Sequence, residues 1–574
     1  MPAVFSRVRR LFAFDWRGRN AEWAALGITL VPLVELARSY STRLPHTDVQ
    51  GSFAKALLVE QRGGLGNVAE LWEHRTTVHG FVTFLVHWLG APLRALGLEH
   101  HVSMLMVLVL ASAAVAASCM AAVGLETKPT RPGWMAGLLL LTALLLSPTY
   151  WMVGQSEHLA VLVGLAAVAP GLSRRWELNL LAGALLAVAF LLKMTTGVVS
   201  ATVIVGLWLL APRRFGRVVT VAAAFVAVSA LLAALLVIEA SELERLLISV
   251  YVNADPSVTW SERLKEGLHG AGGALLQLPA IGFALALAPT VFGRLRRERG
   301  WLLALAYAAL WPLNLAPVFA TALSFPYHLS GIMALVVVTF VLELRPGGQR
   351  IAGERALTAQ LLTAVVVFAL VVNAWLHDKR LVRTLHFEYP EVVLSGCLAG
   401  YVAVVLLLRR SSRRRHFVTL CCSLVLLTAV TAGAVDYGGR DYQRKRRDGF
   451  AEARTWVTQV NGGRLAEHEV LYLASARGAY LLRAPPACNL VYSTVVKAWR
   501  KRPAAEQLEP LESARWYRKC ATRYQGNFVV LERKWFRPSA ITKAGLRTML
   551  RAYQPLADHG TWQLYCRKGS EHCR

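Results

Sequence analysis

The chain has 574 residues, of which 55% are hydrophobic, and its mean hydropathy is +0.42. A water-soluble protein of this length needs far more polar surface, so the composition excludes an ordinary soluble fold. The formal net charge of +28 would suit a nucleic-acid-binding protein, but the basic residues come as short clusters between apolar runs. That placement is typical of membrane-protein loops, so no nucleic acid is expected among the partners.

The N-terminal region predicts a retained membrane helix. A basic stretch, Ser6–Arg10, precedes the first apolar run, as it does in a signal peptide. However, the charged segment Asp15–Glu22 intervenes, and no small-residue cleavage site follows the apolar run. Further along, runs such as Met104–Val123 and Val218–Ile238 approach or reach the ~20 residues that a helix needs to cross hydrocarbon.

Basic clusters place the loops relative to the membrane, because cytoplasmic loops carry the Lys/Arg excess. The chain must leave and return between successive clusters, and the run His416–Val435 adds one more crossing, which predicts about thirteen transmembrane helices. The N-terminus is then cytoplasmic and the C-terminal region extracytoplasmic. The clusters are Arg7–Arg19, Lys128–Arg131, Arg174-Arg175, Arg213–Arg217, Arg294–Arg299, Arg345–Arg355 and Arg409–Arg415.

The segment His79–Leu98 decides this count. It is apolar enough to resemble a span, yet it contains histidines and an arginine, and Gly90 and Pro92 interrupt it as a helix. We therefore predict an amphipathic helix at the outer membrane interface, within a first outer loop that covers residues 41–101. The predicted outer loops also include Ala240–Gly273.

The C-terminal region predicts a soluble α/β domain. Residues 1–436 form the predicted transmembrane domain, and from residue 437 the sequence is polar and alternates helix-like with strand-like stretches. Helices are expected at Ala451–Val460 and near Ala544–Tyr553. The expected strands are Val470–Ala474, Asn489–Ser493, Phe528–Glu532 and Thr561–Cys566.

Cysteine usage agrees with an outer location of this domain. Four of the eight cysteines, Cys488, Cys520, Cys566 and Cys573, lie in it, and an even set suggests disulfides in an oxidising compartment. Four cysteines permit three pairings, which the sequence leaves open. The others, Cys119 among them, lie in apolar runs and are interpreted as packing residues.

Asp48 is the strongest candidate for a catalytic residue. It follows the first membrane helix and is the one carboxylate between Glu35 and Glu60. A carboxylate at the outer membrane edge suits a general base acting on a hydroxyl group. The segment His46-Thr47-Asp48 also reads as a helix start, and the two roles are compatible.

Further polar residues gather at the predicted outer face. Glu157 and His158 open a membrane helix, where a charge requires a cavity or a partner, although the helix dipole also favours Glu157. Lys193 ends another helix and could either snorkel to the interface or meet a lipid phosphate. His74, Arg75 and His79 suit an anionic headgroup, and Tyr327-His328 starts a helix behind Pro326.

This arrangement resembles the GT-C superfamily of membrane glycosyltransferases, which includes protein O-mannosyltransferases and aminoarabinose transferases acting on lipid A. The resemblance covers most of the chain. It lies in Asp48 after the first helix, in the interfacial Thr76-Thr77-Val78-His79-Gly80, and in the loop from Ser147-Pro148 to Glu157. The helix end Leu192-Lys193, the helix start Tyr327-His328 and the final strand Trp562-Gln563-Leu564-Tyr565 also match in placement.

The resemblance implies transfer of a sugar from a polyprenyl-phosphate-linked donor to an extracytoplasmic glycan, lipid or protein, with inversion, at the inner (plasma) membrane. Asp48 would be the general base, with Glu157 as a second catalytic acid residue. The donor phosphate would be bound by Lys193, His328, Arg75 and His79, and the acceptor or sugar by His46, His158 and Tyr327. Val49 follows Asp48 where many members have a second acid, so neither a cofactor nor an obligatory divalent metal is expected.

Two other functions remain open from the sequence. The first is a transporter or flippase of lipid-linked sugars, which commonly shows internal repeats and broken helices at the bilayer midplane. No clear repeat is visible here, and the polar candidates gather at one face. The second is a non-catalytic assembly protein for envelope polysaccharide, which would bind a lipid-linked sugar without turnover.

Overall fold

The computed structural model describes residues 47–64, 76–124, 153–193, 196–237, 279–321, 331–344 and, with short gaps, 465–573, together with isolated positions between these ranges. Three helices lie in the segment 41–101 that the sequence predicts as the first outer loop, a name kept below for this segment: α3 (Thr47–Gln61), α4 (Thr77–Leu89) and α5 (Ala91–Ala95). The bundle that follows contains α6 (His100–Gly124), α8 (Ser156–Ala166), α9 (Val168–Leu172), α10 (Trp176–Leu192), α11 (Gly197–Leu210), η3 (Pro212–Arg214), α12 (Phe215–Val237), α15 (Pro279–Arg299), α16 (Trp301–Thr321) and α17 (Gly331–Leu344).

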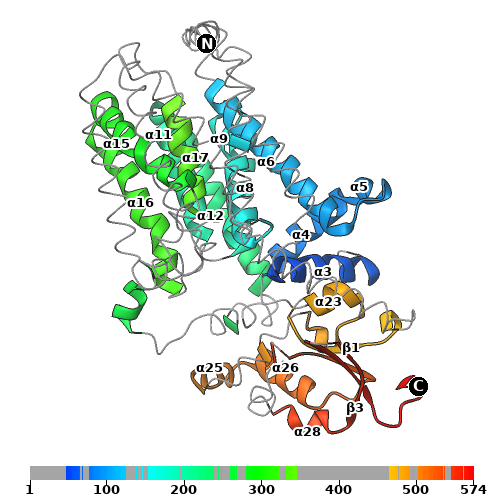
Figure 1. The fold of residues 1–574 in the computed structure, drawn as a ribbon. Coiled ribbons are helices and arrows are strands. Elements are labelled where there is room, and N and C mark those ends of the chain that lie inside the picture. Colours follow the sequence, from blue (N-terminus) through cyan, green and yellow to red (C-terminus); the bar gives the residue numbers. More distant parts are fainter. Residues whose placement is uncertain are drawn as a thin grey trace, which may run out of the picture.

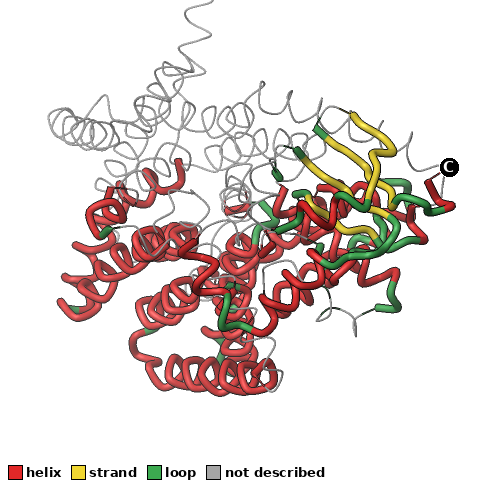
Figure 2. The backbone as a smooth tube through the Cα atoms, turned by 90° about the horizontal axis from the view of Figure 1, so that it is seen from below, coloured by secondary structure: helices red, strands yellow, loops and turns green. Residues whose placement is uncertain are grey.

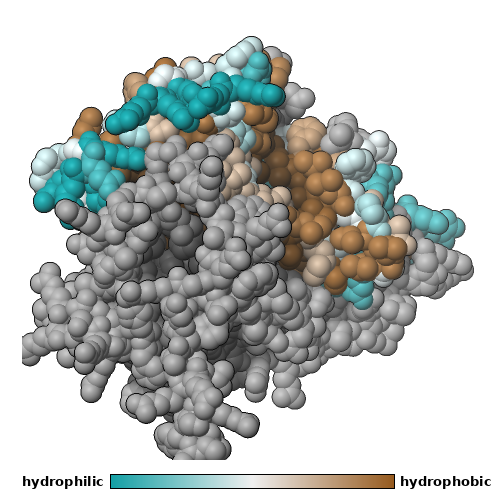
Figure 3. All heavy atoms as spheres, turned by 90° about the horizontal axis from the view of Figure 1, so that it is seen from above, coloured by the Kyte–Doolittle hydropathy of each residue, from teal (hydrophilic) through white to brown (hydrophobic). Residues whose placement is uncertain are grey.

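Apolar helices make up the bundle (Figure 1). Among the described residues, His100–Ala122 and Pro212–Leu235 are long and apolar enough to cross a membrane, and several shorter apolar helices pack with them. These two helices coincide with the predicted runs Met104–Val123 and Val218–Ile238. Seen from above, the described part of the bundle exposes a continuous hydrophobic surface bordered by hydrophilic segments (Figure 3). The predicted number of crossings stays a prediction, because residues 345–464 lie outside the described ranges.

The interrupted helix predicted over His79–Leu98 is confirmed as two helices. α4 ends at Leu89 with Gly90 as its C-cap, and Pro92 lies in the first turn of α5, where proline is tolerated. The faces of α4 are reversed relative to a helix of a soluble protein. Its buried residues are Thr77, His79, Gly80, Thr83 and His87, whereas Phe81, Leu85, Trp88 and Leu89 are exposed. Such a helix suits an apolar surrounding on its outer side.

The C-terminal region folds as the predicted α/β domain. Its sheet has the order β1-β2-β4-β3, with β1 parallel to β2 and the other pairs antiparallel. Figure 2 shows the strands together at one side of the described helices. The strands are β1 (Val470–Leu473), β2 (Phe528–Glu532), β3 (Tyr553–His559) and β4 (Trp562–Arg567). The helical segments are η5 (Leu465–Glu467), α23 (Arg477–Leu482), η6 (Ala487–Asn489), α25 (Arg502–Leu508), α26 (Glu512–Thr522), α28 (Arg547–Leu550) and η7 (Glu571–Cys573).

One predicted strand of this domain is wrong at its start, and one predicted helix is shorter than expected. Asn489 does not open a strand but closes η6, where Cys488 and Asn489 have φ values of 58° and 55°. The helix predicted near Ala544–Tyr553 shrinks to the four residues of α28, and Tyr553 instead begins β3. β3 is an edge strand that contains Pro555 and a register shift beside it, which removes the two-residue alternation that marks a strand in a sequence.

The domain is packed against the first outer loop. One face of the sheet, with Tyr472, Val530 and Leu564, shares a hydrophobic core with Phe53 and Leu58 of α3. The opposite face packs against α26 and α28 and includes Ile248 from the predicted outer loop 240–273. In Figure 1, α3 and α23 accordingly lie between the bundle and the sheet. The predicted boundary between residues 436 and 437 falls outside the described residues.

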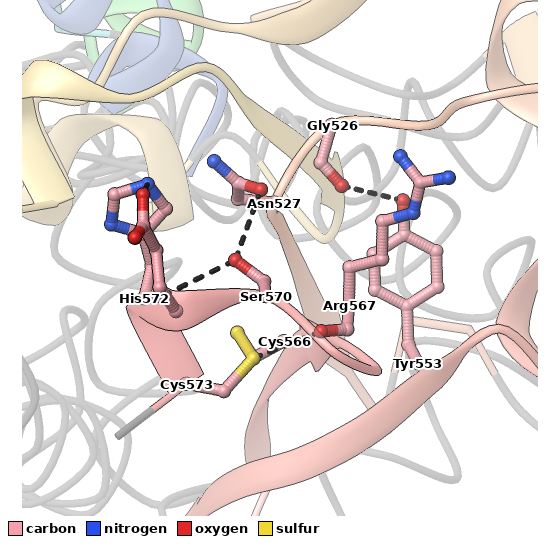
Figure 4. The surroundings of a disulfide bond; sticks show 9 residues. Gly526, Asn527, Tyr553, Cys566, Arg567, Ser570, His572 and Cys573 are labelled. Atoms are coloured by element: carbon pink, nitrogen blue, oxygen red, sulfur yellow. Dashed lines mark hydrogen bonds and ion pairs between the residues drawn. A yellow bond between two sulfur atoms is a disulfide. The ribbon is translucent and has the colours of Figure 1, made fainter.

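The predicted disulfides of the C-terminal domain are formed, and the structure selects one of the three pairings. Cys488 pairs with Cys520, which ties η6 to α26, and Cys566 pairs with Cys573 at the end of β4. Figure 4 shows the surroundings of the second bond. Cys119 is free and buried in the bundle, in agreement with its interpretation as a packing residue.

Candidate functional site at converging helix ends

A buried ion pair joins the start of α8 to the end of α10. The Lys193 ammonium donates a hydrogen bond to Oε1 of Glu157. The side chain of Glu157 is 2% exposed and that of Lys193 is 27% exposed. Each charge lies at the helix end that its sign favours, since Glu157 is in the first turn of α8 and Lys193 is the C-cap of α10. The carboxylate is therefore held by the protein, while part of the lysine side chain remains accessible.

Threonine hydroxyls hold the end of α10 in place. Oγ1 of Thr76 donates to the carbonyl oxygen of Leu191 at 2.8 Å and caps α4 by accepting from the His79 backbone N–H at 3.2 Å. On the other flank, Oγ1 of Thr196 donates to the Ala189 carbonyl at 2.8 Å. These bonds satisfy carbonyls that a helix end leaves unpaired, and they fix the start of α4 beside Lys193.

Asp48 lies in the first turn of α3 and is partly exposed, as its role in opening a helix predicts. Its neighbour Val49 packs against Gly154, three residues before Glu157. Gly154 has a φ of +81°, and a Cβ on it would lie 2.8 Å from Cγ1 of Val49, so this close approach requires glycine. The start of α3 thus meets the turn that leads into α8, which brings Asp48 into the region of the ion pair.

His158 supports the same turn. Its Nδ1 accepts from the Gly154 backbone N–H at 3.3 Å, and its Nε2 lies 3.0 Å from the Leu145 carbonyl oxygen. The side chain is buried, with a relative exposure of 3%. These contacts give His158 a structural task in shaping the turn before Glu157, and its acceptor-binding role stays a prediction.

Lys55 is a residue of this region that sequence reasoning missed. It lies on α3 two turns after Asp48, so both are on one side of that helix. Its side chain is 3% exposed, and a Cβ on Gly80 of α4 would lie 2.8 Å from its Nζ. In a sequence, a single lysine in a helix is usually interpreted as a surface residue. Here Gly80, the residue after His79, has no side chain, which makes room for the buried ammonium of Lys55.

A second buried polar network holds the first outer loop to the C-terminal domain. Nδ1 of His87 lies 2.8 Å from Nε2 of His100, whose Nδ1 lies 3.4 Å from the Tyr480 hydroxyl. At the other end, Nε2 of His87 lies 3.1 Å from Oε2 of Glu60 and 3.2 Å from Nη2 of Arg94. Burial, followed by the Arg94 guanidinium, lowers the pKa of His87, which favours the neutral imidazole.

The remaining predicted site residues cannot be placed. His46, Arg75, Tyr327 and His328 lie outside the described residues. Within the part of the chain that the structure describes, no group of three or more His, Cys, Asp or Glu side chains is arranged to hold a metal ion. Asp48, Glu157, Lys193 and His79 lie within one turn of an end of α3, α8, α10 and α4, and these helices contact one another in the order α3, α4, α10, α8.

These features define a bundle of apolar helices with a C-terminal α/β domain packed on α3. No protein-family model matches the chain, and no curated protein matches it. Among solved structures, it is similar to ArnT from Cupriavidus metallidurans bound to undecaprenyl phosphate, with a TM-score of 0.52 and 15% identity over 95% of this chain and 98% of that one. ArnT from the same organism in the apo state also matches, with a TM-score of 0.47, 16% identity and coverage of 96% and 98%.

The likeness to the ligand-bound ArnT structure extends over nearly the whole of both chains. At this sequence identity it establishes the fold and leaves the activity to be argued from the site. The fold of this chain is thus the fold of the ArnT structure bound to undecaprenyl phosphate.

Proposed function

We propose that this protein is a glycosyltransferase that moves a sugar from a polyprenyl-phosphate-linked donor to an extracytoplasmic acceptor. The observation that carries the proposal is the convergence of a partly exposed carboxylate, Asp48, with a buried Glu157–Lys193 ion pair at one end of the bundle. The fold is that of ArnT, which has been seen with undecaprenyl phosphate, a lipid of the proposed donor class.

In the proposed reaction, Asp48 accepts the proton of an acceptor hydroxyl while that oxygen attacks the anomeric carbon of the donor sugar. The new C–O bond forms as the bond to the lipid phosphate breaks, and the phosphate leaves with the electron pair. Attack opposite the leaving group inverts the anomeric configuration. The hydrophobic faces of the bundle would receive the polyprenyl chain.

Lys193 is proposed to offset the charge of the departing phosphate. Its side chain is 27% exposed, so an anion can approach the ammonium from the accessible side. Glu157 then acts as a positioning residue that fixes Lys193, because a carboxylate that is 2% exposed is shielded from an incoming substrate. His79, Arg75 and His328 are proposed to complete the phosphate site, and His46, His158 and Tyr327 the sugar and acceptor site.

The proposal includes an orientation in the inner membrane, with a cytoplasmic N-terminus, about thirteen crossings and an outer C-terminal domain. Contacts of that domain support it. Parts of the chain predicted to be outside, α3 and the residues Glu244 and Ile248, contact a domain that is also predicted to be outside. Glu244 in particular accepts from the backbone N–H groups of Glu512 and Ser513 at the start of α26, at 3.0 and 2.6 Å.

The test is transfer by the purified protein in proteoliposomes, supplied with a panel of polyprenyl-phosphate sugars, with and without a chelator. Release of lipid phosphate coupled to glycosylation of an acceptor is expected in both conditions. Asp48→Asn should lower the rate by about 10²–10⁴-fold, the contribution of a positioned general base, with no loss of folded protein.

Glu60→Gln is the matched control, because it removes the other carboxylate of α3, at the far end of that helix. It should retain most of the transfer rate. Full activity of Asp48→Asn would exclude Asp48 as the base. Sugar-lipid movement across sealed vesicles without any transfer would instead assign the protein to lipid-linked sugar transport.

A further inference from the structure

A cationic edge of the C-terminal domain has no role in the proposed transfer site. Arg523, Arg551, Arg567 and Lys568 come from three separate segments of the chain, and all four side chains are exposed. We call these four residues the basic edge. They lie where α26 ends, β3 begins and β4 ends.

Main-chain contacts hold these three segments together. The Lys568 backbone N–H donates to the Ala552 carbonyl at 2.9 Å, and the Arg567 N–H donates to the Asn527 carbonyl at 2.9 Å. Arg567 is paired with Tyr553 across β3 and β4. The Tyr553 hydroxyl donates to the Gly526 carbonyl at 2.7 Å, a contact visible in Figure 4 beside Arg567.

The edge is a fixed part of the domain rather than a loose run of charges. Tyr524 and Tyr553 stack with ring centroids 6.3 Å apart and parallel planes beneath it. Burial raises the pKa of Tyr553 to about 12, so its hydroxyl remains a donor at neutral pH. The Cys566–Cys573 disulfide closes the turn after Arg567, and Ser570 in that turn bonds to Oδ1 of Asn527 at 3.3 Å.

The charge balance at this edge favours an anionic ligand. Like charges brought together by folding repel one another, so their convergence costs free energy unless counter-charges relieve it. Two carboxylates lie nearby: Glu571 is 89% exposed, and Glu469 is connected through its carbonyl to the Tyr524 hydroxyl. They leave the edge with an excess of positive charge.

We propose that the basic edge binds an anionic glycan of the cell envelope, one that carries phosphate or uronate groups. Its neighbours Gln525, Asn527 and Ser570 are hydrogen-bonding groups suited to sugar hydroxyls. A membrane surface is less suited, because interfacial segments combine basic with apolar exposed residues. Such an apolar face is found, for example, on α4, which exposes Phe81 and Trp88, whereas the C-terminal domain exposes only the scattered Trp516 and Leu556 among its described large apolar residues.

The test is equilibrium binding of the full-length protein, held in zwitterionic nanodiscs, to polygalacturonate as a uronate polymer and to dextran as a neutral polymer. No lipid-linked donor is added, so failure of the transfer proposal would leave this result unaffected. Binding to polygalacturonate alone is expected, and it should weaken steeply with added salt.

The double variant Arg551→Gln/Lys568→Gln should weaken this binding roughly tenfold, because two charged contacts of about 0.7 kcal/mol each correspond to one factor of ten. Neither side chain is buried, so the domain is expected to fold. Arg483→Gln/Arg515→Gln removes the same charge from exposed positions outside the edge, after α23 and in the first turn of α26, and should leave the affinity within about twofold.

Equal binding of polygalacturonate and dextran would overturn the proposal, and so would an equal loss of affinity in the two double variants. Capture of vesicles rich in phosphatidylglycerol, dependent on Arg551 and Lys568 and without polygalacturonate binding, would assign the edge to a membrane surface instead.

Discussion

The interfacial helix α4 and the C-terminal sheet distribute polar and apolar residues in opposite ways. In α4 the buried face is made of threonine, histidine and glycine, and Trp88 on the outer face is 63% exposed. In the sheet, both buried faces are apolar, with Tyr472 and Leu473 of β1 pointing to opposite cores. The exposed side of the domain carries charged residues such as Arg551 and Lys568.

The contrast shows which surroundings each region is built for. Apolar side chains leave water wherever they can, so an exposed apolar face indicates lipid and an exposed charged face indicates water. On the polar side of α4, His87 meets Glu60 of α3 and His100 of α6, and the N-cap Thr76 donates to the Leu191 carbonyl of α10. The junction of the two regions, at α3, is therefore where a polar site can lie beside the membrane.

The largest expected effect is a difference in stability loss between breaking a buried ion pair of the bundle and breaking an exposed ion pair of the C-terminal domain. Lys193→Met leaves the Glu157 carboxylate buried without its cation and should destabilise the bundle by about 3–5 kcal/mol. Arg533→Met removes a cation from a pair with Asp558 whose side chains are 48% and 45% exposed, and should cost about 0–1 kcal/mol. Thermal unfolding of both variants in detergent measures the difference.

Glu157→Gln provides the control for that prediction. Because Lys193 is 27% exposed, water can solvate its ammonium when the carboxylate is gone, so this variant should be clearly less destabilised than Lys193→Met. Equal losses in the two variants would contradict the asymmetric burial of the pair.

Reduction of disulfides is the next effect in size, and it should act on the C-terminal domain alone. Loop-closure entropy predicts a loss of about 4 kcal/mol for the Cys488–Cys520 bond, which spans 32 residues, and about 2 kcal/mol for Cys566–Cys573, which spans 7. Limited proteolysis after treatment with dithiothreitol, or of Cys→Ser variants, should cut this domain and spare the bundle. Early cleavage within α6–α17 would show that the two regions do not unfold separately.

The smallest effect tests the environment of α4 directly. Leu85→Arg places a charge on its exposed apolar face and should cost about 1 kcal/mol in a bilayer, where the outer surrounding is apolar. Leu556→Arg, at a residue of β3 that is 42% exposed, should be close to neutral because that surrounding is water. Equal stabilities of the two variants in nanodiscs would mean that α4 faces water.

Much of the fold could be predicted because its signals are local. Apolar length marks α6 and α12, and the glycine and proline after Leu89 mark the break between α4 and α5. Short continuous apolar runs mark β1 and β2, and apolar residues at every second position mark β4. The strand β3 was not predicted because Pro555 and a bulge interrupt the alternation of its residues. The turn at Cys488 and Asn489 was not predicted because these residues adopt positive φ angles, which a sequence usually indicates by a glycine.

The sequence by itself indicated the membrane class, selected Asp48, Glu157 and Lys193 as candidates, and determined the presence of disulfides, since composition, charge clusters and cysteine parity are properties of the chain. The outer placement of the candidates stays a prediction. Only the tertiary structure decided that Glu157 and Lys193 are partners and that Lys55 is buried against Gly80. Only the tertiary structure decided the cysteine pairing and the packing of the C-terminal domain on α3. These contacts join residues far apart in the chain, and their energies depend on distances and burial that no local pattern records.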